Sequence, residues 1–343
     1  ILIIMEDRKP NLFNYATSEL SQDAFLAWYF MWADETMTED RELQENAREF
    51  LSLYIKKHFH EYTKPIKNVT VERQYQHIDI LLTVNNDIKI IIEDKIYAGT
   101  HGNQLQRYWD SITGQKMGLY IKMGDESVDY AKKIENNNYI PIYRNDLLAH
   151  FKKCKSNNEI FVSFREYWER NEQVSKAYRD NLKWEAVHVI GFYQDLQKLI
   201  PEANWHYAAN PNGGDYVFNW HWTDILTTFP DKTPEKTHIY LEFSFPCKWA
   251  KHKEFTEHFK LKIKIHLSCE DTKNPRLPKN ELKEKRIAAK WYHLSKFNAV
   301  SKGLSIRPKR SRIGSYMTIS EVSFGDLINN DIQHLNLETL VSK

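Results

Sequence analysis

The sequence lacks the features that mark secreted, membrane-embedded or zinc-stabilised proteins. Its three cysteines, Cys154, Cys247 and Cys269, lie far apart among 343 residues and show neither paired nor zinc-ligand spacing. We therefore expect no disulfide framework and no structural zinc site, as suits a reducing cytoplasm. The apolar run at residues 1–5 is too short for a signal peptide or a membrane span, and acidic residues follow it at once. These absences predict a cytoplasmic protein that does not enter the membrane.

Other common signatures are missing as well. None of the 14 histidines falls in an HExxH or similar pattern, and no internal repeat or low-complexity tract is evident. The composition, 41% hydrophobic and 13% aromatic, is sufficient to bury a sizeable core. We expect two domains, residues 1–180 and residues 181–343.

Charge is nearly balanced overall but unevenly distributed. The formal net charge is +2, whereas residues 248–312 contain 19 Lys and Arg against 6 Asp and Glu, a local charge of +13 that leaves −11 for the rest. The basic segment could be a surface for a polyanion, with Lys309, Arg310 and Arg312 as candidate nucleic-acid contacts. It could equally be a set of solvated lysine-rich faces.

The most informative stretch is residues 77–95, HIDILLTV-NND-IKIIIEDK. Two apolar runs flank Asn-Asn-Asp, residue types that tolerate left-handed backbone, so the pattern predicts an antiparallel hairpin. Pairing centred on Asn86 sets Asp79 opposite Glu93 and His77 opposite Lys95. The hairpin therefore brings two carboxylates and an ammonium together at the end remote from its turn.

The strand period of two puts Glu93 and Lys95 on one face and turns Asp94 away. Carboxylates on adjacent strands repel each other unless a cation lies between them, and oxygen-only ligation is typical of Mg²⁺. Lys95 would then position an attacking water. An exposed strand end with alternating charge is the alternative interpretation. The continuous apolar run at residues 90–92 argues against it, because such a strand is buried on both faces.

Asp79 followed by Glu93-Asp94-Lys95 resembles the PD-(D/E)XK nuclease superfamily, although Ile78 stands where a Pro is often found. Gln104-Leu-Gln-Arg-Tyr108 resembles the Gln-x-x-x-Tyr motif of the RecB-like branch. The run from Glu19 to Trp28, ELSQDAFLAW, is similar to the opening helix of one bacterial subgroup. The three blocks occur in the family's order and span residues 11–145, under half of the chain.

The resemblance implies a Mg²⁺-dependent nuclease, with Mn²⁺ able to substitute. Asp79, Glu93 and the Asp94 carbonyl would bind the metal, and Lys95 would be catalytic. It further implies site roles for Glu19, Gln104 and Tyr108. From the residues alone, Glu19 could simply be an acid favoured in a first helical turn, and the other two a pair on a helix surface.

The resemblance also implies an α/β fold, a restriction-endonuclease-like αβββαβ core, followed here by a C-terminal α+β domain that binds substrate or senses a ligand. The periodicity predicts helices at about 18–32, 38–60 and 103–112, strands at 69–75, 117–123 and 139–143, and the hairpin between them. In the first helix the expected buried stripe is Leu20, Ala24, Ala27, Trp28 and Met31.

Beyond residue 201, a turn signal at 210–215 separates aromatic strands. Tyr216, Phe218, Trp220 and Trp222 share one strand face, where they could stack nucleobases, but sheet core is the favoured interpretation. Further strands are expected at 239–245, 261–267 and 316–322, with a basic helix at about 281–297.

The predicted substrate is nucleic acid, with DNA favoured over RNA, and the subgroup suggests phage or mobile-element defence. A homodimer is one arrangement for double-strand cleavage, and the sequence leaves it open. The alternative function is a nucleic-acid-binding or sensor protein on a nuclease-like fold that no longer cuts. The intact Asp79, Glu93 and Lys95 argue against it, because a binding module does not need three ionised residues placed together.

Overall fold

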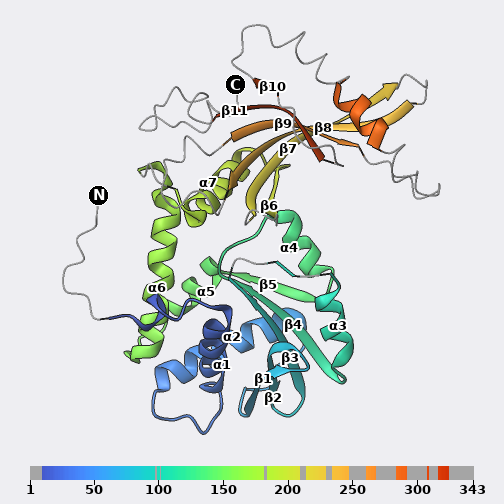
Figure 1. Ribbon diagram of the computed structural model, residues 1–343. Helices are drawn as coiled ribbons and strands as arrows, with labels where there is room; N and C mark the ends of the chain where they lie inside the picture. The colour runs from blue at the N-terminus through green and yellow to red at the C-terminus, as the bar shows by residue number, and fades with distance from the viewer. Residues whose placement is uncertain are drawn as a thin grey trace. The chain divides into compact units, whose positions relative to one another are not determined.

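The computed structural model describes residues 10–96, 99–100, 102–180, 184–208, 214–228, 234–246, 260–267, 283–291, 307–308 and 316–323. The chain divides into two compact units, Ile1–Val174 and Ser175–Lys343, which are described separately (Figure 1). Across these described ranges, no helix combines the length and the apolarity needed to span a membrane.

The first unit contains a five-stranded sheet in the order β1-β2-β3-β4-β5 (Figure 1). Strands β1 to β3 are antiparallel, whereas β3, β4 and β5 are parallel. Its elements are η1 (Leu12–Asn14), α1 (Glu19–Met31), α2 (Arg41–His58), β1 (Val69–Tyr75), β2 (Ile78–Val84), β3 (Ile88–Lys95), α3 (Gln104–Ser111), β4 (Gln115–Lys122), α4 (Val128–Glu135), β5 (Tyr139–Tyr143), α5 (Arg144–Phe151) and α6 (Glu159–Lys176). This order confirms the predicted restriction-endonuclease-like α/β core.

The β2–β3 hairpin has the predicted register. Ile80 pairs with Ile92 and Val84 with Ile88, so the pairing is centred on Asn86, whose φ of 56° is left-handed. The prediction that His77 opposes Lys95 was wrong. Gln76 and His77 have φ of 51° and 71° and form the turn between β1 and β2. Two consecutive left-handed residues suit a two-residue hairpin loop, but the usual Asn-Gly signal is absent here.

Helix α1 begins after Ser18, whose side chain accepts a hydrogen bond from the backbone of Ser21. The predicted buried stripe was right only in part: Ala27 is buried and Trp28 packs against the core, whereas Leu20 is 61% exposed and Ala24 is exposed as well. The buried residues are instead Gln22, Asp23, Phe25, Leu26, Ala27, Tyr29 and Phe30. Two polar residues thus lie on the buried face, and a search for apolar periodicity cannot find a face that includes them.

The strand β3 is covered on both faces, as its apolar run predicted. Ile90 and Ile92 belong to a core cluster that includes α1, α2, α5 and α6. Ile91 belongs to a second cluster with residues of α3 and α4. Because side chains alternate along a strand, Glu93 and Lys95 extend the Ile91 face and Asp94 extends the α1 face.

The second unit contains an antiparallel six-stranded sheet in the order β10-β11-β9-β8-β7-β6. Its elements are η2 (Ala177–Arg179), α7 (Ala186–Leu199), β6 (Asn204–Ala208), β7 (Asp215–Thr228), β8 (Pro234–Pro246), β9 (Lys260–Leu267), β10 (Arg307–Pro308) and β11 (Tyr316–Ser323), with a further helix at residues 283–291. Tyr216, Phe218 and Trp220 are buried in a cluster with α7, which confirms the core interpretation for these three rings. The side chain of Trp222 lies outside what is described.

Candidate active site

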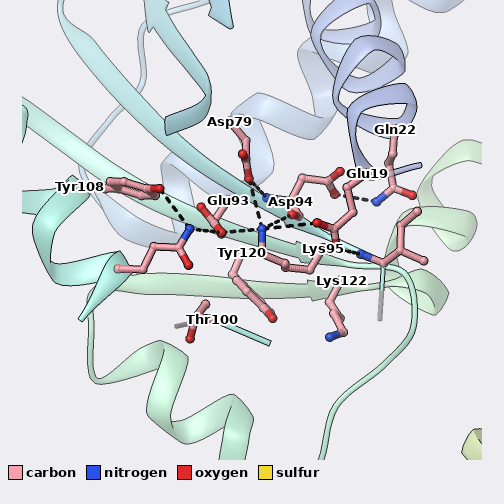
Figure 2. Close-up of polar contacts among 12 residues, drawn as sticks. Glu19, Gln22, Asp79, Glu93, Asp94, Lys95, Thr100, Tyr108, Tyr120 and Lys122 are labelled. Carbon is pink, nitrogen blue, oxygen red and sulfur yellow. Dashed lines mark hydrogen bonds and ion pairs between the residues drawn. The ribbon is translucent and has the colours of Figure 1, made fainter. Parts of the chain in front are cut away.

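Lys95, the last residue of β3, lies at the centre of a group of oxygen atoms (Figure 2). Its Nζ is 2.6 Å from Glu93 Oε1 and 3.5 Å from Asp79 Oδ2. It also donates a 2.8 Å hydrogen bond to the Asp94 carbonyl oxygen and lies 3.9 Å from Glu19 Oε2. Asp79, Glu93 and Lys95 therefore share one face, as their alternation along the strands predicts, and one ammonium faces three carboxylates.

Burial dominates the electrostatics of this group. Glu93 is fully buried, which raises its pKa to about 7 even though Lys95 acts to lower it. Burial by itself would lower the pKa of Lys95, but the Glu93 and Asp79 carboxylates outweigh it and hold that pKa above its ordinary value. The side chains of Asp79 and Glu19 remain 16% and 39% exposed. The site is thus closed at Glu93 and open at Asp79 and Glu19.

Asp94 points its side chain away from this face and toward α1, as the strand period predicts. Gln22 Nε2 donates a 2.6 Å hydrogen bond to Asp94 Oδ1, and both residues are buried. The Asp94 backbone N–H donates to Asp79 Oδ2 at 3.0 Å. Burial raises the pKa of the Asp94 carboxyl, with neighbouring Asp23 adding to the rise. Burial likewise raises the pKa of Asp23 to about 6.

Gln104 and Tyr108, one turn apart on α3, lie beside Glu93. Gln104 Nε2 donates to Glu93 Oε1 at 2.7 Å and to the Tyr108 hydroxyl at 3.0 Å. Tyr108 is 8% exposed, so the interpretation of these two residues as a pair on the helix surface is wrong. The pair reaches the site because α3 packs on the face of β3 that carries Glu93.

Glu19 reaches the same centre from the first turn of α1. Its Oε1 accepts a 3.1 Å hydrogen bond from the backbone N–H of Ile96, just past β3, while its Oε2 is the oxygen near Lys95. The carboxylate does more here than favour a helix N-terminus, because it connects α1 to the end of the strand. Glu19 thus lies beside Lys95, and its role in the site stays a prediction.

Lys122 is a neighbour of the site that the sequence did not reveal. It pairs in register with Lys95 across the parallel ladder and is 1% exposed. Its Nζ is 2.7 Å from Glu126 Oε1, which also accepts a long hydrogen bond of 3.4 Å from the Tyr120 hydroxyl. Burial lowers the pKa of Lys122 and raises that of Glu126. The sequence does carry a matching alternation, Glu93-x-Lys95 on β3 and Tyr120-x-Lys122 on β4. This match places Lys122 at the site only once the pairing of β3 with β4 is known.

The chemistry of the site suits a hard divalent cation, because every donor near Lys95 is an oxygen. Glu93 Oε2 is buried and has no hydrogen-bond partner among the described residues. Within those residues, no three His, Cys, Asp or Glu side chains are grouped closely enough to hold a metal by themselves. The oxygens that could hold such a cation are those of the Asp79 and Glu93 carboxylates and the Asp94 carbonyl, and Lys95 Nζ lies within 3.5 Å of an oxygen of each.

The predicted nucleic-acid contacts Lys309, Arg310 and Arg312 lie outside the described residues.

Comparison with known proteins gives one family: the model of the PD-(D/E)XK nuclease superfamily matches residues 10–183, just over half of the chain. No curated protein and no solved structure matches the chain. The matched region contains Asp79, Glu93 and Lys95 with the contacts described above. The chain therefore belongs to the PD-(D/E)XK nuclease superfamily.

Proposed function

We propose that this protein is a Mg²⁺-dependent nuclease that hydrolyses phosphodiester bonds, with DNA as the favoured substrate and Mn²⁺ able to replace Mg²⁺. Membership of the superfamily implies nuclease activity, a nucleic-acid substrate and use of a divalent metal. The observation that carries the proposal is the position of Lys95 Nζ, in contact with the Glu93 carboxylate and the Asp94 carbonyl and near Asp79.

In this proposal Asp79, Glu93 and the Asp94 carbonyl hold the metal. A divalent cation there would polarise the phosphoryl group and lower the pKa of a bound water. The raised pKa of Lys95 keeps its ammonium charged at neutral pH. Its position suits Lys95 to orient the attacking water by donating hydrogen bonds and to stabilise developing negative charge.

The residues around this centre would hold it in shape. Gln104 fixes one oxygen of Glu93 by its 2.7 Å hydrogen bond, and Tyr108 fixes Gln104 in turn. Glu19 presents a partly exposed carboxylate near Lys95, which suits a role in binding water or metal. Orientation of this kind by hydrogen-bonded neighbours is what keeps a metal ligand in a productive geometry.

For the rest of the chain we propose that residues 181–343 bind the substrate or sense a ligand. The charge of +13 over residues 248–312 supports a polyanion partner, and Lys309, Arg310 and Arg312 are the proposed phosphate contacts. The wide cysteine spacing supports a cytoplasmic location. Phage or mobile-element defence and a homodimer that cuts both strands are further parts of the proposal.

The test is a cleavage panel with the purified full chain on single- and double-stranded DNA and RNA, each with Mg²⁺, with Mn²⁺ and with a chelator. We expect cleavage of DNA that needs the metal and is lost in Lys95→Ala. If the chain binds nucleic acid but cleaves none of the four substrates with either metal, the sensor function is favoured instead.

A further inference from the structure

One face of α1 carries three polar residues that all meet the end of β3. Glu19, Gln22 and Asp23 are spaced i, i+3 and i+4, so they lie together on the helix. Glu19 accepts a hydrogen bond from the Ile96 N–H, and Gln22 donates to Asp94. Gln22 and Asp23 are almost fully buried. Neither was among the metal ligands or catalytic residues expected from the sequence.

Asp94 connects Gln22 to the active site. Its side chain is held from α1, its N–H donates to Asp79 Oδ2, and its carbonyl oxygen accepts from Lys95 Nζ. The β2–β3 ladder ends at Ile80 and Ile92, so within the described part of the sheet no pairing with β2 fixes the Asp94 peptide groups. On its other edge the strand stays paired, with Asp94 beside Ile121 of β4. On the β2 side, the Asp94 N–H and carbonyl meet the Asp79 and Lys95 side chains, while Gln22 holds the Asp94 side chain from the α1 face.

Helix α1, which carries Gln22, is held in place by packing against two other helices. Phe25 of α1 stacks on Phe164 of α6 with ring centroids 3.6 Å apart, and the Tyr29 hydroxyl donates to Asn46 of α2 at 2.8 Å. Because α1 is fixed by this packing, Gln22 presents its amide from a defined position. Loss of that amide would leave the buried Asp94 Oδ1 without its donor, which is costly in an interior.

We propose that Gln22 is a positioning residue of the active site. Together with the pairing of β3 and β4, it orients the Asp94 N–H and carbonyl through the Asp94 side chain, and so contributes to the placement of Asp79 and Lys95. This inference rests on the proposed function of the site. It assigns to α1 the task of aligning the metal-binding oxygens, in addition to supplying Glu19.

The test variant is Gln22→Met, which removes the amide donor but keeps the volume of the side chain. The half-saturating Mg²⁺ concentration for cleavage should rise by about tenfold, as is usual when a partner behind a metal ligand is lost. The KM for nucleic acid should not change. The Asp94 amide should exchange its hydrogen about fivefold faster, because one net hydrogen bond is removed from its neighbourhood.

Gln44→Met is the matched control. Gln44 is also a buried helical glutamine, and its Nε2 donates to the Asp34 and Met37 carbonyls. These acceptors lie in the connection between α1 and α2 rather than on β3. The control should lower the melting temperature in a similar way, yet leave the Mg²⁺ dependence and the exchange of the Asp94 amide as in the wild type.

A double-variant comparison tests the route. If Gln22 acts through Asp94, then Gln22→Met should add nothing to the Mg²⁺ shift already present in Asp94→Ala. Equal exchange of the Asp94 amide in Gln22→Met and Gln44→Met would overturn the inference. That measurement needs no activity, so it decides the role of Gln22 even if the wild type cleaves nothing, an outcome that would count against the proposed function alone.

Discussion

The two sheets differ in the balance and burial of their lysine and carboxylate side chains. At the end of β3 one ammonium, Lys95, faces Asp79, Glu93 and Glu19, and Glu93 is fully buried. On β9 the excess is basic. Lys260 pairs with Glu321, and Lys262 and Lys264 share Glu242, with lysine side chains 35%, 19% and 17% exposed.

The difference separates ion pairs on the surface of a sheet from a buried group of charges that suits a bound metal. Partly exposed pairs such as Lys260–Glu321 are screened by water and contribute little to stability. A buried group with more acid than base is unfavourable by itself, and a divalent cation would relieve it. An acidic excess in the first unit and a basic excess in the second suit binding a metal and binding a polyanion, respectively.

The largest expected effect follows from removal of the central ammonium. Lys95→Ala should lower the rate of cleavage at saturating nucleic acid by about 10² or more, because it removes electrostatic stabilisation at the reacting phosphate. Mg²⁺ binding, measured by calorimetry, should survive, since Asp79 and Glu93 remain. Lys64→Ala, which breaks the exposed Lys64–Asp87 pair at the turn of the hairpin, should leave this rate unchanged. Full activity of Lys95→Ala would refute the assignment of this site.

A smaller effect is expected from the Asp79 carboxylate, which lies 3.5 Å from Lys95 Nζ. Asp79→Asn removes a formal charge from the metal ligands, so the half-saturating Mg²⁺ concentration should rise by about tenfold or more. Excess Mg²⁺ should restore part of the cleavage, unlike in Lys95→Ala. If both variants respond to Mg²⁺ in the same way, Asp79 and Lys95 do not differ in role as proposed.

The pH dependence of stability should distinguish the buried acids. Glu93 has a pKa of about 7 in the folded chain against an ordinary value of 4.5, so the folded state binds more protons between these values. Its contribution to the free energy of unfolding should therefore fall as pH rises from about 4.5 to about 7 and stay low above that. Asp23, with a pKa raised to about 6, acts in the same direction.

The measurement is thermal unfolding from pH 5 to pH 8, with a chelator and with Mg²⁺. Stabilisation by Mg²⁺ should grow over this range, because the metal binds the ionised Glu93. Glu93→Gln should flatten both trends and leave the smaller slope due to Asp23 and Asp94. A wild-type Mg²⁺ effect that is the same at pH 5 and pH 8 would contradict the raised pKa of Glu93.

The smallest effect concerns the basic segment. If Lys309, Arg310 and Arg312 bind phosphates, charge reversal at all three should reduce the slope of log affinity against log salt by about 0.9 for each phosphate that is no longer neutralised on duplex DNA. The measurement is binding to labelled DNA across a salt series, with the metal omitted to prevent cleavage. An unchanged slope would mean that these residues belong to a solvated face.

Local patterns made much of the fold predictable from the sequence. The Asn-rich turn predicted the β2–β3 register about Asn86, because this signal acts over a few residues. Lys122 could not be found in this way. Its position beside Lys95 depends on the parallel pairing of β3 with β4, which no short-range pattern specifies. Part of the buried face of α1 was also missed, because Gln22 and Asp23 are buried for their polar contacts.

The site is built from strands that are close together in the sequence and from one that is farther away, so its parts need not form at the same time during folding. Strands β1 to β3 are joined by short turns, so Asp79 and Glu93 can approach each other through local pairing. The parallel β3–β4 ladder starts with Ile88 beside Gln115 and closes a longer loop that includes α3. We expect the hairpins to form early and β4 to dock later, because longer loops lose more entropy on closure. The acids would then be neighbours while still hydrated, and the barrier to docking would include the dehydration of Glu93.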